Sequence, residues 1–190
     1  MREWSQEKGV RLWAVHRLDE EVSGILLFAK TSEAHRSANE WFEKRLAHKH
    51  YEALTESVRS PLRPHQKVVW RSRLLRGKKR AYEREFGKEA LTEAVLEGEI
   101  SWNSQTWSCW KLSPLTGRAH QLRFELSKQG CPIWGDSLYG SKISFPIPET
   151  IALRAVSLNL QLCAEREQFG LPVEFKALGL VEWMKENIPS

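Results

Sequence analysis

Four consecutive residues near the start of the chain, His16, Arg17, Leu18 and Asp19, place one carboxylate beside two basic groups. An apolar stretch from Val22 to Lys30 follows, which is typical of a buried strand. A carboxylate beside positive charge in a partly dry site stays ionised and can act as a nucleophile or a base. Asp19 is therefore the first candidate for chemistry.

A second segment, residues 115–123 with the sequence LTGRAHQLR, combines a turn with basic and amide side chains at the start of an expected helix. The planar guanidinium of Arg118 can hold a carboxylate through two hydrogen bonds, which fixes geometry as well as charge. Arg118 is therefore a second candidate for chemistry, as the partner of a carboxylate.

Together the two segments resemble the HRLD and GRxHQ(L/I)R motifs of the RluA-type family of RNA pseudouridine synthases, which isomerise chosen uridines in RNA. Residues 49–53 resemble the family's KxYxA stretch, residues 87–92 a weaker family stretch, and residues 135–140 its GDxxYG turn. The resemblance extends from about residue 15 to residue 160, with the motifs in the family's order.

The resemblance implies that Asp19 acts at the bond between ribose and uracil, either as a nucleophile at C1′ or as a base. It also implies that Arg118 keeps Asp19 charged, and that Tyr51 packs on the target base and serves the C5 proton step. These three residues form the expected catalytic set. No cofactor and no metal ion is expected.

RNA is the expected partner, and the charge of the chain is distributed accordingly. The formal net charge is +5, but residues 59–84 alone carry +9 and the rest of the chain −4. A local basic patch is typical of a protein that binds a polyanion, although a solvated loop that aids solubility explains the charge equally well. We predict a loop or ragged hairpin over 59–84, and RNA contacts from Arg17, Lys49, Arg76, Lys78, Lys79, Arg80, His120, Gln121 and Arg123.

Three departures from the family pattern stand out. Val22 occupies the place of a usual threonine, and Arg154 that of a usual histidine. The family's upstream KPxG segment and the S4-like RNA-binding domain of many members have no counterpart in the sequence.

The expected fold is α+β, with a mostly antiparallel mixed sheet flanked by helices and one domain over residues 1–190. More strands than helices are expected, and few strand–helix–strand units alternate. The expected strands cover 22–30, 51–58, 90–100, 106–112, 151–160 and 173–177. Helices are expected over 33–47 with Ser32 as N-cap, around 119–129, and over 181–187.

The composition is that of a globular protein, with 41% hydrophobic and 28% charged residues. No apolar run reaches the roughly 20 residues of a membrane helix, and the first residues show no secretory signal. Three scattered cysteines form neither a metal motif nor a disulfide framework, which favours a reducing cytoplasm. We expect a cytoplasmic monomer without a membrane partner.

Other features of the sequence are typical of a serine hydrolase, of a metal site and of a non-catalytic RNA-binding protein. Residues 135–138 spell a serine-hydrolase motif, but neither His nor Asp follows Ser137 to activate it. His48 and His50 form a pair without a third metal ligand of suitable spacing. The serious alternative is a non-catalytic RNA-binding protein, against which the combination of Asp19, Tyr51 and Arg118 argues.

Overall fold

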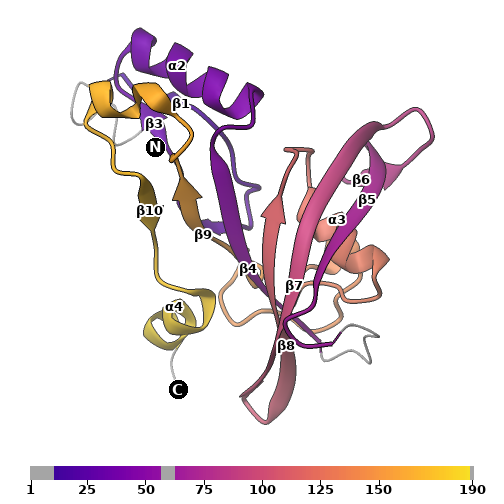
Figure 1. The fold of residues 1–190 in the computed structure, drawn as a ribbon. Coiled ribbons are helices and arrows are strands. Elements are labelled where there is room, and N and C mark those ends of the chain that lie inside the picture. Colours follow the sequence, from indigo (N-terminus) through magenta and orange to yellow (C-terminus); the bar gives the residue numbers. More distant parts are fainter. Residues whose placement is uncertain (1–10, 57–62, 189–190) are drawn as a thin grey trace.

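The computed structural model describes residues 11–56 and 63–188 of the chain (Figure 1). One large sheet has the strand order β10-β9-β4-β8-β7-β5-β6, with β2 paired to β9; β1 and β3 form a separate pair. All pairs are antiparallel except β2 with β9, which confirms the predicted α+β fold. The strands are β1 (Trp13–Ala14), β2 (Ser23–Gly24), β3 (Phe28–Ala29), β4 (His48–Glu56), β5 (Lys67–Arg76), β6 (Ala81–Glu83), β7 (Lys88–Trp102), β8 (Gln105–Pro114), β9 (Leu153–Asn159) and β10 (Glu174–Lys176).

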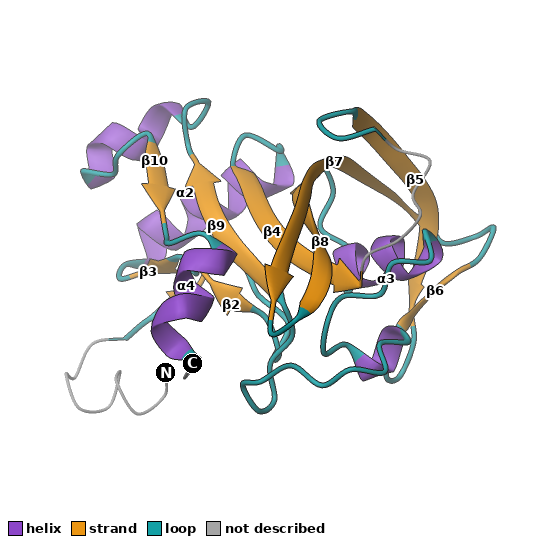
Figure 2. Ribbon diagram, turned by 90° about the horizontal axis from the view of Figure 1, so that it is seen from below, coloured by secondary structure: helices purple, strands orange, loops and turns teal. Residues whose placement is uncertain are grey.

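The helices are short and lie beside the strands (Figure 2). Helix α2 (Ser32–Glu43) contacts β1 and β3, α3 (Gln121–Lys128) contacts β5 to β8, and α4 (Leu180–Asn187) contacts β9. Two 3₁₀ turns, η1 (Ser137–Tyr139) and η2 (Ala164–Phe169), complete the set. None of the helices in the described residues is long and apolar enough to cross a membrane.

The centre of the sheet is the long β7–β8 hairpin, which the alternating sequence predicts correctly. On β7, alternate residues from Ala90 to Leu96 are buried. The two-residue turn places Asn103 and Ser104 at positive φ (49° and 62°), the backbone of the turn type that matches strand twist. Strand β4 then pairs with β8 on one side and with β9 on the other.

Helix α2 follows from its sequence, with one correction at its start. Ala38 and Trp41 are buried at helical spacing, and Glu33 lies in the first turn, where the helix dipole favours an acid. The N-cap is Thr31 rather than the predicted Ser32, because the Thr31 hydroxyl accepts a hydrogen bond from the backbone N–H of Ala34 at 3.1 Å. The helix ends at Glu43 and not at residue 47; Arg45 then adopts a left-handed φ of 58°.

The continuous strand predicted for residues 22–30 is wrong, since the segment forms two separate two-residue strands. Gly24 has a φ of 117°, and a Cβ atom there would lie within 2.2 Å of the Ala155 carbonyl oxygen. The chain therefore leaves β9 after Gly24 and continues to β3, which pairs with β1.

The basic segment 59–84 is a hairpin in its described part; residues 59–62 lie outside the described residues. Strand β5 buries Trp70, Ser72 and Leu74 on one face and exposes Lys67, Arg71 and Arg73 on the other. Of the predicted loop or ragged hairpin, the described residues form the hairpin: β5 pairs with β6, and residues 77–80 turn the chain between them. Two of the exposed bases face acids on β7: Lys67 lies 2.7 Å from Glu93, and Arg71 3.8 Å from Glu89.

Candidate active site

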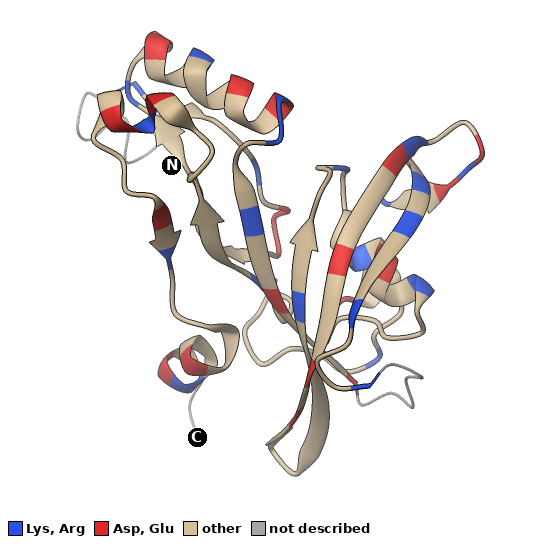
Figure 3. Cartoon of the chain, viewed as in Figure 1, with Lys and Arg blue, Asp and Glu red and all other residues tan. Residues whose placement is uncertain are grey.

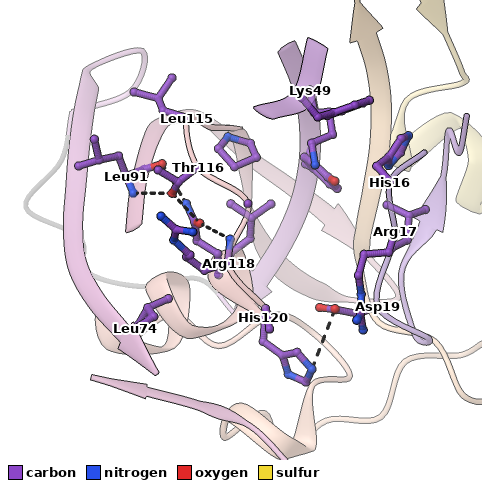
Figure 4. A pocket seen from close by; sticks show the side chains of 18 of the residues that line it. His16, Arg17, Asp19, Lys49, Leu74, Leu91, Leu115, Thr116, Arg118 and His120 are labelled. Atoms are coloured by element: carbon purple, nitrogen blue, oxygen red, sulfur yellow. Dashed lines mark hydrogen bonds and ion pairs between the residues drawn. The ribbon is translucent and has the colours of Figure 1, made fainter. Parts of the chain in front are cut away.

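A cleft of about 980 Å³ opens between the two halves of the sheet. One wall comes from the β1–β2 loop, the end of α2 and the start of β4; the other comes from β5, β7 and the loop between β8 and α3. Figure 4 shows His16, Arg17, Asp19 and Lys49 on one side, and Leu91, Leu115, Thr116 and Arg118 on the other. The structure therefore brings both chemistry-bearing segments to one cavity.

Asp19 lies at this cleft with its side chain 17% exposed. Arg123 Nη1 lies 3.9 Å from Asp19 Oδ2, and His120 Nε2 lies 4.0 Å from Asp19 Oδ1 (Figure 4). Both distances exceed hydrogen-bond length, so neither group covers the oxygens of Asp19. The carboxylate is thus accessible to a substrate while positive charge lies beside it.

Arg123 is a buried hub of charge, with its side chain 1% exposed. It donates from Nε and Nη2 to Asp136 at 2.7 and 2.8 Å, and from Nη1 and Nη2 to Glu21 at 2.8 and 3.2 Å. Burial opposes the charge, yet the hydrogen bonds and charges of Asp136 and Glu21 raise the pKa of Arg123. Arg123 therefore stays cationic next to Asp19.

The predicted pairing of Arg118 with Asp19 is wrong, because Arg123 occupies that place. Arg118 Nε donates instead to the carbonyl of Glu89 at 2.8 Å, across the cleft from Asp19 (Figure 4). Arg118 still lines the cleft, and a catalytic role for it stays a prediction.

Gln121 positions the loop that carries these residues, which corrects the RNA contact predicted for it. Its side-chain oxygen accepts from the Arg118 N–H and from the Thr116 hydroxyl, at 3.0 and 2.8 Å. Its amide nitrogen donates to Leu91 and Thr92 of β7, at 2.9 Å each. Being 4% exposed and fully engaged, Gln121 has no donor or acceptor left for RNA.

The same burial argument applies to Arg123, whose predicted RNA contact does not fit its carboxylate partners.

His120 differs, since it lies at the cleft with a left-handed φ of 53°. Its ring nitrogen Nδ1 is buried without a hydrogen-bond partner. Non-glycine residues adopt this backbone rarely, and it costs of order 1 kcal/mol or more where it occurs. Here it accompanies a ring directed at Asp19.

Tyr51 reaches the cleft from the middle of the sheet. It pairs with Leu112 of β8 and Ala155 of β9, at a bulge between His50 and Tyr51. Its side chain is 6% exposed and lines the cavity. Burial, with a smaller contribution from the charge of Asp19, raises the pKa of the Tyr51 hydroxyl, which therefore stays protonated at neutral pH.

Two further basic groups of β4 and the HRLD segment line the same wall. Burial lowers the pKa of Lys49, while the charge of Asp19 acts in the opposite direction. Burial and the charge of Lys49 lower the pKa of His16 to about 4; its Nε2 accepts the N–H of Leu27 at 3.1 Å. His16 is therefore neutral and structural, whereas the Lys49 ammonium faces the cleft.

The remaining predicted RNA contacts divide into two groups. Arg17 and Arg76 are exposed and line the cleft, one on each wall. Lys78, Lys79 and Arg80 are exposed in the turn between β5 and β6, outside the cavity lining. The blue segments of Figure 3 follow β5 toward this turn.

In the part of the chain that the structure describes, no three His, Cys, Asp or Glu side chains are arranged to hold a metal ion. The chemistry that this cleft itself offers is that of an accessible carboxylate flanked by an arginine, an imidazole and a buried phenol. Such a carboxylate can act as a nucleophile or as a base.

A family model described as RNA pseudouridylate synthase matches residues 1–128. The chain belongs to the RNA pseudouridylate synthase family. Within this family it is 33% identical over 173 residues to the dual-specificity RNA pseudouridine synthase RluA of Vibrio vulnificus, covering 82% of this chain and 64% of that protein. The predicted resemblance to the RluA type is thereby confirmed.

Other proteins that are similar to this chain are also named as pseudouridine or pseudouridylate synthases. The ribosomal large subunit pseudouridine synthase C of Rickettsia felis is 32% identical over 173 residues, which cover 90% of this chain and 54% of that protein. The solved structure of human RNA pseudouridylate synthase domain containing 1 superposes with a TM-score of 0.69 at 26% identity, covering 84% and 68% of the two chains. This synthase-family chain spans just under two thirds of the Vibrio protein's length and about half of the Rickettsia protein's.

Sequence reasoning missed three side chains around Arg123 in this synthase-family chain. Asp136 and Tyr139 belong to the GDSLYG stretch, which resembles the family's GDxxYG turn. Tyr139 lies under the guanidinium at 5.4 Å, and its hydroxyl accepts the N–H of Ala81 at 2.7 Å. Glu21 lies two residues after Asp19, but nothing in the sequence indicates that it faces residue 123.

Proposed function

We propose that this chain isomerises uridine to pseudouridine in RNA, with Asp19 acting at the glycosidic bond. The observation that carries the proposal is Asp19 itself: a carboxylate open to a large cleft, with Arg123 at 3.9 Å and His120 at 4.0 Å. Membership in the synthase family supports it.

The reaction is an internal rearrangement that needs neither oxidant nor reductant. The bond between C1′ and N1 of uracil breaks, and C1′ then bonds to C5 of the same base. The proton on C5 leaves and N1 gains one, so atoms and charge balance. Asp19 attacks C1′ or removes a ribose proton, while Arg123 offsets its negative charge.

The substrate must present its base outside a stacked helix, because the reacting atoms cannot be reached within one. The cleft volume of about 980 Å³ accommodates an extruded nucleotide, and Tyr51 offers the base a flat ring. Arg17, Lys49 and Arg76 line the same cavity as candidates for the flanking phosphates. We propose ribosomal or transfer RNA as the substrate, supported by the ribosomal large subunit named for a relative.

We further propose that the chain acts as a cytoplasmic monomer. Its three cysteines, Cys109, Cys131 and Cys163, are free thiols, which supports a reducing compartment. Sedimentation at working concentration tests the monomer.

The test of the function is tritium release from RNA labelled at C5 of uracil, using ribosomal and transfer RNA transcripts. Wild type should release tritium, and Asp19→Asn should release none while binding RNA with nearly unchanged affinity, since backbone contacts remain. Glu20→Gln is the matched control, because it removes an exposed acid one residue away. Turnover by Asp19→Asn would contradict the role of Asp19. RNA binding without turnover by wild type would instead identify a non-catalytic RNA-binding protein.

A further inference from the structure

Arg123 lies near three carboxylates, and its distances to them differ. Asp136 and Glu21 lie at hydrogen-bond distance, each contacting two of its nitrogen atoms. Asp19 lies at 3.9 Å, too far for a hydrogen bond. The residue expected to do the chemistry is therefore the one that Arg123 holds least.

The number of N–H groups on the guanidinium explains why Asp19 has the weakest contact with Arg123. Arginine has five N–H groups in a fixed plane. Four hydrogen bonds engage four of them: two to Asp136, from Nε and Nη2, and two to Glu21, from Nη1 and Nη2. One N–H of Nη1 is left for Asp19, so a two-pronged contact with Asp19 is excluded while Glu21 occupies that edge.

Asp136 and Glu21 differ in a way that makes Glu21 the adjustable partner. The side chain of Asp136 is 0% exposed, whereas that of Glu21 is 35% exposed and borders a second cavity of about 430 Å³. A buried carboxylate that lost its arginine would be left without compensation. Glu21 can be replaced without burying a charge.

We propose that Glu21 is a positioning residue that occupies the outer edge of the Arg123 guanidinium and thereby withholds Arg123 from Asp19. Asp19 then keeps its oxygens free for the substrate while remaining close to the positive charge. Without Glu21, Arg123 would clamp Asp19 in two hydrogen bonds, which would hold it ionised but weaken it as a nucleophile or base. This inference rests on the proposed function for its kinetic consequence only.

Several other groups face Asp19 and are common to wild type and variant. They come from the start of α3, from β4 and from η1, and are His120, Lys49, Tyr51 and Tyr139. Arg123 is faced by Glu21, Asp136, Asp19 and Tyr139. A difference in activity between wild type and Glu21→Gln at acid pH therefore reports the charge of Glu21 and its contact with Arg123.

The kinetic test compares wild type, Glu21→Gln, Glu21→Asp and Glu20→Gln in the tritium-release assay between pH 4.5 and 8. Glu21→Gln should lower kcat about threefold to tenfold, the effect of one interaction of hydrogen-bond size, with KM unchanged. The acid limb of its pH–rate profile should move about one pH unit lower. Glu21→Asp should restore part of kcat, and Glu20→Gln should match wild type.

The structural test does not depend on activity. Crystal structures of wild type and Glu21→Gln should show Arg123 Nη1 moving from 3.9 Å to about 2.7–2.9 Å from the Asp19 carboxylate. If wild type releases no tritium, the proposed function fails while this comparison still decides the inference. An unchanged distance between Arg123 Nη1 and Asp19 in Glu21→Gln overturns the inference. An acid limb of its pH–rate profile that stays in place or moves to higher pH also overturns it, because Glu21 would then only stabilise the position of Arg123. Thermal melting confirms that each variant is folded.

Discussion

At the scale of single residues, we predict that the ring of Tyr51 contributes to RNA binding and its hydroxyl to the chemical step. Burial keeps this hydroxyl protonated, so it can take part in the C5 proton step only as a neutral group. Tyr51→Phe should lower kcat strongly with little change in RNA affinity. Tyr51→Ala should weaken both, since stacking on a base contributes about 1–3 kcal/mol. Single-turnover rates and filter binding measure the two effects; a fully active Tyr51→Phe would leave Tyr51 as a stacking surface only.

The two arginines of the GRAHQLR segment should respond differently to the same conservative change. Arg123→Lys loses the planar contact with two carboxylates, so we expect a loss of about 2 kcal/mol or more in unfolding free energy and very little turnover. Arg118→Lys loses one hydrogen bond to the Glu89 carbonyl. We therefore expect its unfolding free energy to fall by only about 1 kcal/mol. Urea denaturation and tritium release on both variants test the contrast. Equal effects would mean that Arg118 matters beyond this contact.

Residue types could be predicted from the sequence better than their partners. Asp19 and Tyr51 were selected by motif, and both line the cleft. Arg118 was paired with Asp19 although Arg123 lies there. Both arginines belong to one segment, and which of them faces Asp19 depends on the left-handed backbone of His120 just before α3. Such a local turn has no periodic signature.

The β5–β6 hairpin carries its own prediction. Changing Arg76, Lys78, Lys79 and Arg80 to glutamine should weaken RNA binding similarly for all sequences. Each lost phosphate contact should flatten the dependence of log affinity on log salt by about 0.7–0.9. The rate at saturating RNA should change little, because none of these residues belongs to the expected catalytic set.

Affinity measured at several salt concentrations checks this prediction. Lys176→Gln with Lys185→Gln is a suitable control, since both lysines are exposed on β10 and α4 and neither lines the cleft. An unchanged slope in the hairpin variant would make its turn a solvated loop without RNA contacts.

Helix α3 carries a buried acid whose effect on stability depends on pH. Glu125 is 0% exposed, and burial raises its pKa against the smaller opposing effects of Ser72 and Lys128. The folded state therefore holds the proton more tightly than the unfolded state, so stability is lost as pH rises above the ordinary glutamate range. Glu125→Gln should reduce this loss. Thermal melts at pH 5 and pH 8 should show a larger gain for the variant at pH 8; an equal gain would contradict it.

Among the elements, the basic run left the prediction for residues 59–84 open between a loop and a ragged hairpin. Residues 67–76 alternate buried and exposed positions as a strand does, with Lys67, Arg71 and Arg73 on the exposed face. Helix α2 was predicted well, because its buried face recurs at helical spacing within one continuous segment. Its cap differed by one residue since adjacent Thr31 and Ser32 can both cap.

At the scale of the whole molecule, the cleft depends on pairings between distant parts of the chain. Residues 16–19 and 114–118 form opposite walls, and His120 and Arg123 lie beside Asp19, because β4 pairs with both β8 and β9. Strand register over such separations is set by the assembled core rather than by local preference. The α+β class was therefore predictable from the strand and helix patterns, whereas the strand order was not.

The place of β4 in the sheet also has a consequence in time. Its partner β9 begins roughly 100 residues after β4 ends, so synthesis at about 5–20 residues per second leaves that edge of β4 uncovered for roughly 5–20 s. A local hairpin such as β7–β8 forms within about 1–10 μs of emerging. The wall of the cleft that carries Tyr51 is thus among the last parts of the nascent chain to be completed, and until then its open edge is available to other strands.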